Sequence, residues 1–377
     1  MTGTIDEDMK RIEEEIQKTP YNKATQRHIG LLKAKLARLR DEKIKRRKIG
    51  AAQSEGFGVK KSGHATVALV GYPSVGKSTL LNLIAGTESK VAAYDFTTLD
   101  AIPGLLTYRG AEIQFVDLPG IIEGASKGKG RGWEPLSMAR SADLLLVMCD
   151  IYRSKFEGLL SELYAAGIRV NRSPPDIRIK KTSRGGVTVN STVKLTKLDK
   201  GTITAILSEF KIVNAFVVFR EDADSERLVD AILMNRVYAP AICILNKVDM
   251  AEKGQVDEIL HEARSRGFSP IPISASTGEG VEGLKAKVFE SLRLIRIYLK
   301  KPGADADTSE PLVVHTGASV GDICNTIHGT WRRRFRYAYV WGKSAKFPGQ
   351  TVGLEHKLCD QDILTIFVQR VSKDEST

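Results

Sequence analysis

Residues 65–79, Ala-Thr-Val-Ala-Leu-Val-Gly-Tyr-Pro-Ser-Val-Gly-Lys-Ser-Thr, constrain the fold of this chain more than any other stretch. Residues 65–70 form an uninterrupted apolar run, typical of a strand that is buried on both faces of a parallel sheet. The run leads directly into four residues that match the motif G-x-x-x-x-G-K-[ST]: Gly71, Gly76, Lys77 and Ser78. Residues 80–85 are expected to form the helix that follows. Strand, glycine-rich loop and helix in this order predict a phosphate-binding P-loop.

The glycines allow successive backbone N–H groups to turn inward around a phosphate. Lys77 is placed to reach the β- and γ-phosphates, and the Ser78 hydroxyl is placed to bind Mg²⁺. The expected nucleotide contacts in this loop are Gly71, Tyr72, Pro73, Ser74, Val75, Gly76, Lys77, Ser78 and Thr79. The loop alone does not choose between ATP and GTP.

Two later segments are expected to surround the phosphates. The polar residues 91–99 include Phe96, Thr97 and Thr98, and they lie where a GTPase keeps the threonine that completes the Mg²⁺ shell. Residues 104–108 and 112–117 are expected to form a hairpin that ends in a D-x-x-G motif. The residues of that motif are Asp117, Leu118, Pro119 and Gly120. Asp117 can hold Mg²⁺ through water, and the Gly120 N–H can contact the γ-phosphate.

The nucleotide base is specified near residue 246. A buried strand at residues 241–245 opens onto Asn246, Lys247, Val248 and Asp249, an N-K-x-D motif. The Asp249 carboxylate can accept both N1–H and the exocyclic amine of guanine, and Asn246 is expected to bond the other edge of the base. Adenine lacks N1–H, so such a site rejects it by leaving buried polar groups unpaired. Residues 270–276 add a strand and a turn that supports the base: Ser274, Ala275 and Ser276. Together the motifs predict a GTP site at the carboxyl ends of the strands.

Composition limits the class of protein. The 377 residues allow two or three domains, and 42% hydrophobic with 27% charged residues is typical of a soluble protein. No apolar run reaches the roughly 20 residues that span a bilayer, and no signal peptide is evident, so no membrane association and a cytosolic or nuclear location are expected. The four cysteines and six histidines show no metal-ligand spacing. The formal charge of +12 favours polyanionic partners.

Much of the positive charge lies near the N-terminus. Residues 6–18 and a segment from about Asn22 onward predict two helices, and residues 21–50 are rich in Lys and Arg against only Asp41 and Glu42. This basic helical hairpin could contact RNA phosphates or an acidic protein, or its apolar side could simply pack on the main domain. Residues 50–63 are expected to be a flexible connector.

The chain between Asp117 and Asn246 exceeds the length of one crossover, which indicates an inserted α+β subdomain. In it, residues 177–181 and 187–190 are expected to form a hairpin, and residues 203–210 a helix. A partner surface and a simple structural elaboration remain open for this insert.

Residues 279–298 are expected to be the closing helix of the nucleotide domain. From residue 312, strand, helix and three strands predict a β-grasp module. Its residues 331–337 and 343–347 interleave cations with aromatic rings, which favours RNA contact over a purely structural role.

The motifs of residues 71–79, 94–99 and 117–125 resemble those of the Obg-type GTPases. With the basic N-terminus, the insertion and the C-terminal module, the chain is similar to the developmentally regulated GTP-binding (DRG) branch of that family over nearly its whole length. The resemblance implies a TRAFAC-class G domain, an S5D2-like insert and a TGS domain, with Ser78 and Thr98 as the Mg²⁺ ligands. It also implies a cytoplasmic protein that contacts the ribosome, rRNA or tRNA through its N-terminal arm and TGS domain. A DRG-family regulatory protein is the implied partner of an otherwise monomeric chain.

Residues after the D-x-x-G motif bear on hydrolysis. Many GTPases place there a Gln that orients the attacking water, whereas this chain has Ile121, which predicts slow intrinsic turnover. Some relatives with this replacement use K⁺ held by a P-loop Asn, and this chain has Ser74 at that position, so K⁺ stimulation is a hypothesis. Arg131 could stabilise transition-state charge, although a solvated loop arginine is the simpler interpretation.

The sequence therefore predicts an α/β P-loop GTPase with a mostly parallel sheet. The expected division is an N-terminal arm at 1–60, a G domain at 61–170 and 236–300, the insert at 171–235, and a linker with the TGS domain at 301–377. Lys77, Thr98, Asp117 and Gly120 are the expected catalytic residues for Mg²⁺-dependent conversion of GTP to GDP. The expected role is a ribosome-associated switch in translation. The alternative is an RNA- or ribosome-binding adaptor in which GTP is mainly structural.

Overall fold

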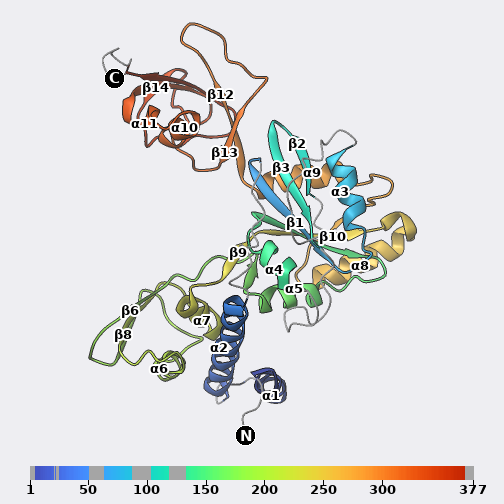
Figure 1. The fold of residues 1–377 in the computed structure, drawn as a ribbon, viewed down its shortest axis with the longest axis vertical. Helices are drawn as coiled ribbons and strands as arrows, with labels where there is room; N and C mark the ends of the chain where they lie inside the picture. Colours follow the sequence, from blue (N-terminus) through green and yellow to red (C-terminus); the bar gives the residue numbers. More distant parts are fainter. Residues whose placement is uncertain are drawn as a thin grey trace. The chain divides into compact units, whose positions relative to one another are not determined.

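The computed structural model describes residues 5–20, 22, 25–50, 63–86, 103–118 and 133–369, apart from the side chains of 44–50, 103, 133 and 134 (Figure 1). The chain forms two compact units. One comprises Val59–Ile121, Ser141–Phe156 and Pro240–Thr377, and the other comprises Met1–Gly58, Ile122–Arg140 and Glu157–Ala239. Within the described ranges, no helix has the length and hydrophobicity needed to cross a membrane.

The first unit is built around a six-stranded sheet in the order β11-β10-β4-β1-β3-β2. Its strands are β1 Ala65–Gly71, β2 Pro103–Tyr108, β3 Ala111–Asp117, β4 Leu144–Asp150, β10 Ala241–Asn246 and β11 Ile271–Pro272. All neighbours are parallel except β2 and β3, which form the expected antiparallel hairpin. The buried strand predicted at residues 65–70 is confirmed as β1, and the apolar runs of β1 and β4 are buried along their whole length, which is typical of central parallel strands.

Helices pack on both faces of this sheet. Alternate strand residues such as Val67 and Ile244 share a core with α3 Lys77–Ala85 and α9 Val281–Ser291. Leu245, next along β10, belongs instead to a core with α8 Lys253–Ser265. A short 3₁₀ turn, η1 Val248–Met250, precedes α8. This arrangement confirms the α/β fold class, and it brings the carboxyl ends of β1, β3, β4 and β10 to one edge.

The helix expected over residues 279–298 is wrong in its second half. Helix α9 ends at Ser291, Arg293 takes a left-handed backbone conformation (φ 52°), and Leu294–Leu299 form strand β12. Alternation in Leu-Ile-Arg-Ile-Tyr-Leu explains the change, because Ile295 and Ile297 enter the C-terminal core while Arg296 between them does not. Part of the segment assigned to the G domain therefore belongs to the C-terminal sheet.

That C-terminal sheet has five strands in the order β13-β12-β16-β14-β15. The remaining elements are β13 Leu312–His315, α10 Val320–Ile327, α11 Trp331–Arg334, β14 Phe335–Trp341, β15 Gln350–Val352 and β16 Asp362–Val368. Helix α10 starts with a capping box between Ser319 and Asp322 and packs on one face of the sheet. The element order agrees with the predicted β-grasp module.

The second unit begins with the predicted helical hairpin, α1 Ile5–Lys18 and α2 Gln26–Gly50, held by an apolar cluster that includes Met9, Ile12 and Leu36. Helix α2 continues through the basic residues 43–48 to Gly50. Two further helices are α4 Trp133–Ala139 and α5 Phe156–Ala165, and the parallel pair β5 Ile168–Val170 and β9 Val237–Ala239 forms the base of the insertion.

The insertion differs from the predicted hairpin. Strands β6 Ile177–Lys181 and β7 Val187–Ser191 do not pair with each other, because both pair with β8 Ala215–Phe219, which lies between them. The reason is hydrophobicity: β8, Ala-Phe-Val-Val-Phe, supplies the buried centre, whereas the polar side chains of β6 and β7 suit edge strands. Helices α6 Lys200–Glu209 and α7 Ser225–Leu233 complete the insert.

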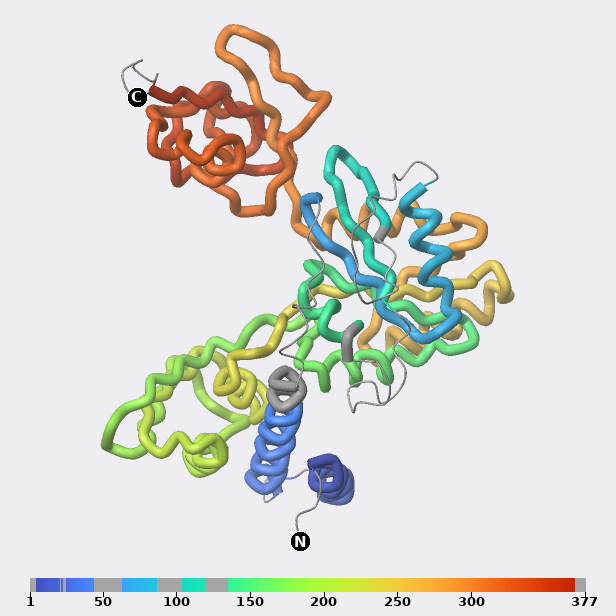
Figure 2. The backbone as a smooth tube through the Cα atoms, in the orientation of Figure 1, coloured from blue at the N-terminus to red at the C-terminus, as the bar shows by residue number. Residues whose placement is uncertain are grey.

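Helix α2 contacts α6 and α7 of this insert, and Ala34 is part of the insert's core (Figure 2). The N-terminal arm therefore packs on the inserted subdomain.

Candidate functional site

The P-loop has the backbone geometry that its sequence predicts. Ser74 and Gly76 have positive φ values of 65° and 93°, and α3 starts at Lys77. A Cβ added at Gly76 would lie 2.3 Å from the Asn246 Nδ2 atom, so glycine is required there by space as well as by conformation. The loop residues from Gly71 to Thr79 all lie in the described part of the chain, at the end of β1.

Lys77 is the buried cation of this loop. Its side chain is only 7% exposed, and its Nζ donates to the carbonyl oxygens of Gly71 (3.3 Å) and Tyr72 (3.1 Å). Burial lowers the pKa of Lys77, while the nearby Asp117 carboxylate acts in the opposite direction. The Lys77 ammonium is removed from water and bonded to neutral carbonyl oxygens, so a bound phosphate could add a strong electrostatic attraction.

Ser78 and Asp117 form the candidate metal site. The Ser78 Oγ donates to the Asp117 Oδ2 at 2.5 Å, which brings α3 and the end of β3 together. The other carboxylate oxygen, Asp117 Oδ1, is buried and has no hydrogen-bond partner among the described residues. Hydroxyl and carboxylate oxygens are the ligands that Mg²⁺ prefers, directly or through water. This orphaned oxygen therefore fits a cation or a cation-bound water.

Several predicted phosphate contacts lie outside the described residues: Phe96, Thr97, Thr98, Pro119 and Gly120. Leu118 is described, is buried, and donates its N–H to the Leu69 oxygen at 3.3 Å. Its contact fixes the chain leaving Asp117 against β1. The roles of Thr98 and Gly120 thus remain predictions.

Asn246 makes two hydrogen bonds within the protein, and its expected contact with guanine stays a prediction. Its Nδ2 donates to the Val75 oxygen at 2.8 Å, and its Oδ1 accepts the Ala275 N–H at 2.9 Å. The side chain is 2% exposed. Asn246 therefore joins the P-loop to the loop at residues 274–276, and both of its polar atoms are used within the protein.

Asp249 is the carboxylate available for a base. It is exposed in η1, and its Oδ2 accepts a hydrogen bond from the Ser276 Oγ at 3.1 Å. Ser274 and Ser276 contact each other at 3.0 Å, and hydrogen bonds from these hydroxyls lower the pKa of Asp249. The serines thus keep the carboxylate ionised and could orient it toward the N1–H and amine of guanine.

Lys247 makes a contact that the sequence did not predict. Its Nζ donates to the Ser74 oxygen at 2.8 Å and to Asp150 Oδ2 at 2.6 Å. The N-K-x-D motif is therefore bonded to the P-loop through two adjacent side chains, Asn246 and Lys247. Asp150 has no motif of its own, and its position at the end of β4 was the available signal.

Comparisons with known proteins agree with this site. Residues 66–181 match the family model described as 50S ribosome-binding GTPase, residues 184–294 match the C-terminal region of that domain, and residues 295–368 match the TGS domain. Human developmentally-regulated GTP-binding protein 2 is 43% identical over 96% of this chain and 98% of its own length. The chain belongs to the DRG family. It is also similar to Drosophila melanogaster guanylate binding protein 128up, 45% identical over 97% of this chain and 99% of that protein. An uncharacterized GTP-binding protein of Methanocaldococcus jannaschii is 52% identical over 97% of this chain and 93% of its own length.

Membership in the DRG family makes this chain a GTP-binding protein with a P-loop GTPase domain and a TGS domain. It supports GTP hydrolysis in general, and binding of GTP and GDP with the Mg²⁺ that GTPases typically use. The Ser78 and Asp117 geometry described above is consistent with that metal.

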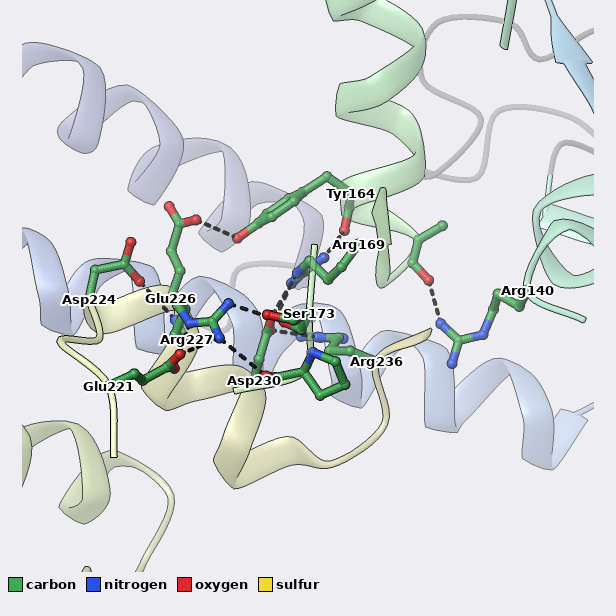
Figure 3. Close-up of polar contacts among 12 residues, drawn as sticks. Arg140, Tyr164, Arg169, Ser173, Glu221, Asp224, Glu226, Arg227, Asp230 and Arg236 are labelled. Atoms are coloured by element: carbon green, nitrogen blue, oxygen red, sulfur yellow. Dashed lines mark hydrogen bonds and ion pairs between the residues drawn. The ribbon is translucent and has the colours of Figure 1, made fainter. Parts of the chain in front are cut away.

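The DRG-family insert carries a second charged centre, which is built from other residues than the nucleotide motifs (Figure 3). Arg169 on β5 makes two bonds to Asp230 on α7, at 2.6 and 2.8 Å, and Arg236 adds a third at 3.1 Å. All three side chains are at most 7% exposed. Asp230 therefore has both oxygens satisfied, and the cluster fastens the base of the insertion to α7.

Cations of the N-terminal arm are also paired. Lys33 contacts Glu226 at 2.7 Å, Arg40 contacts Glu13 at 2.9 Å, and Lys43 pairs with Asp6. Arg38 lies 3.3 Å from Glu209. These side chains hold α2 to α1 and to the insert, which reduces the positive charge that the arm offers to RNA.

Proposed function

We propose that this DRG-family protein is a ribosome- or RNA-associated switch of translation that hydrolyses GTP slowly. The guanine-nucleotide half of the proposal is supported by the P-loop, the orphaned Asp117 oxygen and the exposed Asp249 carboxylate. In this scheme Lys77 neutralises phosphate charge, Ser78 and Thr98 hold Mg²⁺, and Asp249 selects guanine. A cytoplasmic location and a partner of the DRG regulatory type are part of the same proposal.

The observation that carries the RNA half is an aromatic face on the C-terminal sheet, formed by Tyr337, Tyr339, Trp341 and Phe367. Ala338 and Val340 of β14 point into the core with α10, so the alternating residues Tyr337, Tyr339 and Trp341 lie on the opposite face. Phe367 of β16 is paired with Tyr337 in the sheet, and their ring centroids are 4.6 Å apart. All four aromatic side chains are half-buried. Rings on an open sheet can stack unpaired bases.

Cations border this face. The Lys300 Nζ lies 4.9 Å from the Trp341 ring, and Lys343 and Lys346 are exposed in the loop after β14. The structure revises the sequence interpretation here, because Trp331 and Phe335 of the basic stretch pack against the module's core. We therefore propose the aromatic face, rather than residues 331–335 or the paired cations of α2, as the principal RNA contact.

Slow hydrolysis follows from Ile121, which replaces the water-orienting Gln and lies outside the described residues. Single-turnover hydrolysis in KCl and NaCl tests whether K⁺ supplies the missing charge stabilisation. Faster hydrolysis in KCl is expected if it does, and equal rates would refute K⁺ stimulation while leaving the switch itself intact.

Sedimentation with ribosomes, in GDP and in a non-hydrolysable GTP analogue across a salt series, tests the proposed switch. Binding favoured by the analogue is expected, with a salt slope that reports the phosphates contacted. Tyr339→Ala should weaken this binding by about tenfold, since loss of one base stack costs ~1–3 kcal/mol. The matched control is Phe216→Ala, which removes a 38% exposed ring from the insert and should have no effect. Equal binding in both nucleotides would instead support the adaptor function.

A further inference from the structure

Asp150 is a buried carboxylate next to the nucleotide motifs that no sequence motif includes. It is the last residue of β4, which lies between β1 and β10 in the sheet, and it pairs with Asn246 in the register of β4 and β10. Only 4% of its surface is exposed. Asp150 therefore sits where the P-loop strand and the N-K-x-D strand both end.

Both oxygens of Asp150 are used, each for a different purpose. The Oδ1 atom accepts the N–H groups of Tyr152 (3.2 Å) and Arg153 (2.9 Å), which fixes the carboxylate in a tight turn. The Oδ2 atom accepts the Lys247 Nζ at 2.6 Å. One oxygen thus sets the position of the carboxylate, and the other holds the lysine.

Lys247 connects Asp150 to the P-loop through hydrogen bonds. Its Nζ also donates to the Ser74 oxygen at 2.8 Å. Lys247 and Ser74 each have φ of 65°, a left-handed conformation that is strained for residues with side chains. Such conformations persist when surrounding contacts hold them, and here a single ammonium contacts the Ser74 carbonyl and the Asp150 carboxylate together.

We propose that Asp150 is a positioning residue for the guanine-nucleotide site. By holding the Lys247 ammonium against the Ser74 carbonyl, Asp150 fixes the phosphate-binding loop relative to the base-binding loop before nucleotide enters. The inference rests on the proposed guanine-nucleotide site. Asp150 itself touches no nucleotide in this scheme, so it affects affinity for the whole nucleotide and leaves the choice of base to Asp249.

The test is Asp150→Asn, measured by dissociation of a fluorescent GDP analogue from the full chain. The Asn oxygen can still accept the two turn N–H groups, while the ion pair with Lys247 is lost. We expect GDP to dissociate about tenfold faster, because the charge-assisted hydrogen bond from Lys247 to Asp150 is lost. Affinity for inosine diphosphate should fall by the same factor, so the preference for GDP over this analogue stays unchanged.

Asp143→Asn is the matched control. Asp143 precedes the opposite end of the same strand, where its Oδ2 accepts the Thr66 N–H at 2.8 Å. This variant should keep the dissociation rate of the unmodified protein. Asp150→Glu retains the charge and should recover part of the loss caused by Asp150→Asn.

Lys247→Met distinguishes positioning from a general structural effect, because it leaves the Asp150 turn intact. It should accelerate GDP release on its own, and Asp150→Asn added to it should cause no further change. Unchanged release from a folded Asp150→Asn variant, or independent effects in the double variant, would overturn the proposal. Failure of the unmodified protein to bind GDP would refute the guanine-nucleotide site itself, which is a separate result.

Discussion

This protein has two charged centres: the nucleotide edge of the six-stranded sheet, with Lys77 and Asp117, and the Asp230 cluster of the insertion. They differ in how far their charged groups are paired within the protein. At Asp230, Arg169 and Arg236 occupy both carboxylate oxygens. At the nucleotide edge, Asp117 Oδ1 has no partner among the described residues, and Lys77 is held by neutral carbonyls. A closed ion-pair network thus forms in the insertion, whereas buried Lys77 and half-buried Asp117 leave the nucleotide edge open to a ligand.

The difference indicates how each centre acts on the free energy of the protein. Removal of either partner from a complete buried ion pair strongly destabilises the folded state, because the remaining charge would be buried without a counter-charge. A buried charge that lacks a partner reduces stability until a ligand supplies the missing interaction. Burial lowers the pKa of Lys77 accordingly, because removal from water disfavours the charged ammonium. We therefore expect the free energy of unfolding to depend mainly on the Asp230 cluster, and the affinity for nucleotide to depend mainly on Lys77 and Asp117.

The largest expected effect is on stability, from Asp230→Asn. Arg169 and Arg236 would lose the buried carboxylate that pairs with both of them, and loss of one partner of a buried pair costs about 3–5 kcal/mol. Urea unfolding, with amide hydrogen exchange of β5 and α7, measures this loss in the insert. Affinity for GDP should not change.

The control for this prediction is Asp176→Asn. Asp176 and Arg220 form an exposed pair at 4.0 Å, with side chains 57% and 49% exposed, so the free energy of unfolding should change by less than about 1 kcal/mol. Equal destabilisation by both substitutions would show that the closed cluster has no special role.

Lys77→Met should show the opposite behaviour. Without nucleotide, relief of ammonium burial offsets the lost bonds to the Gly71 and Tyr72 carbonyls, so the free energy of unfolding should change by less than about 1 kcal/mol. Affinity for GDP should fall about a hundredfold, or ~2.7 kcal/mol, because no cation meets the phosphates. Isothermal titration calorimetry and urea unfolding of the same sample provide both values. A large loss of stability without nucleotide would contradict the distinction between the two centres.

Much of the nucleotide edge could be predicted from sequence because its signals are local. The P-loop, D-x-x-G and N-K-x-D motifs each follow a strand that the sequence predicts, and strand ends of a parallel sheet must meet at one edge. Contacts between motifs could not be predicted in the same way. The bonds from Asn246 to Val75 and from Lys247 to Ser74 join residues 171 and 173 positions apart, and only the folded sheet brings them together.

The insertion was predicted less well because its pairings are not local. Strands β6 and β7 follow each other in sequence, yet β8 separates them, and the apolar run of β8 was the missed signal. Helix α7 and the Arg169–Asp230 pair were missed too, since nothing in the sequence links β5 to a carboxylate 61 positions later. At the other end of the chain, strand β12 was read as helix because Leu294–Leu299 follow α9 after a short break.

The smallest expected effect concerns Asp249, an exposed carboxylate that sharpens the contrast with buried Asp230. Hydrogen bonds from Ser274 and Ser276 lower its pKa from the usual 3.8, so it remains ionised as the pH falls and becomes protonated only below that value. The preference for GDP over inosine diphosphate, which lacks the amine, should therefore be constant from pH 8 to pH 5. Fluorescence competition at several pH values measures it, with Asp249→Asn as the variant whose preference is small throughout. A preference that declines between pH 8 and pH 5 would mean that a group other than Asp249 reads the amine. Base selection would then rest on a titrating residue elsewhere at this edge, and the serine hydrogen bonds would have only a structural role.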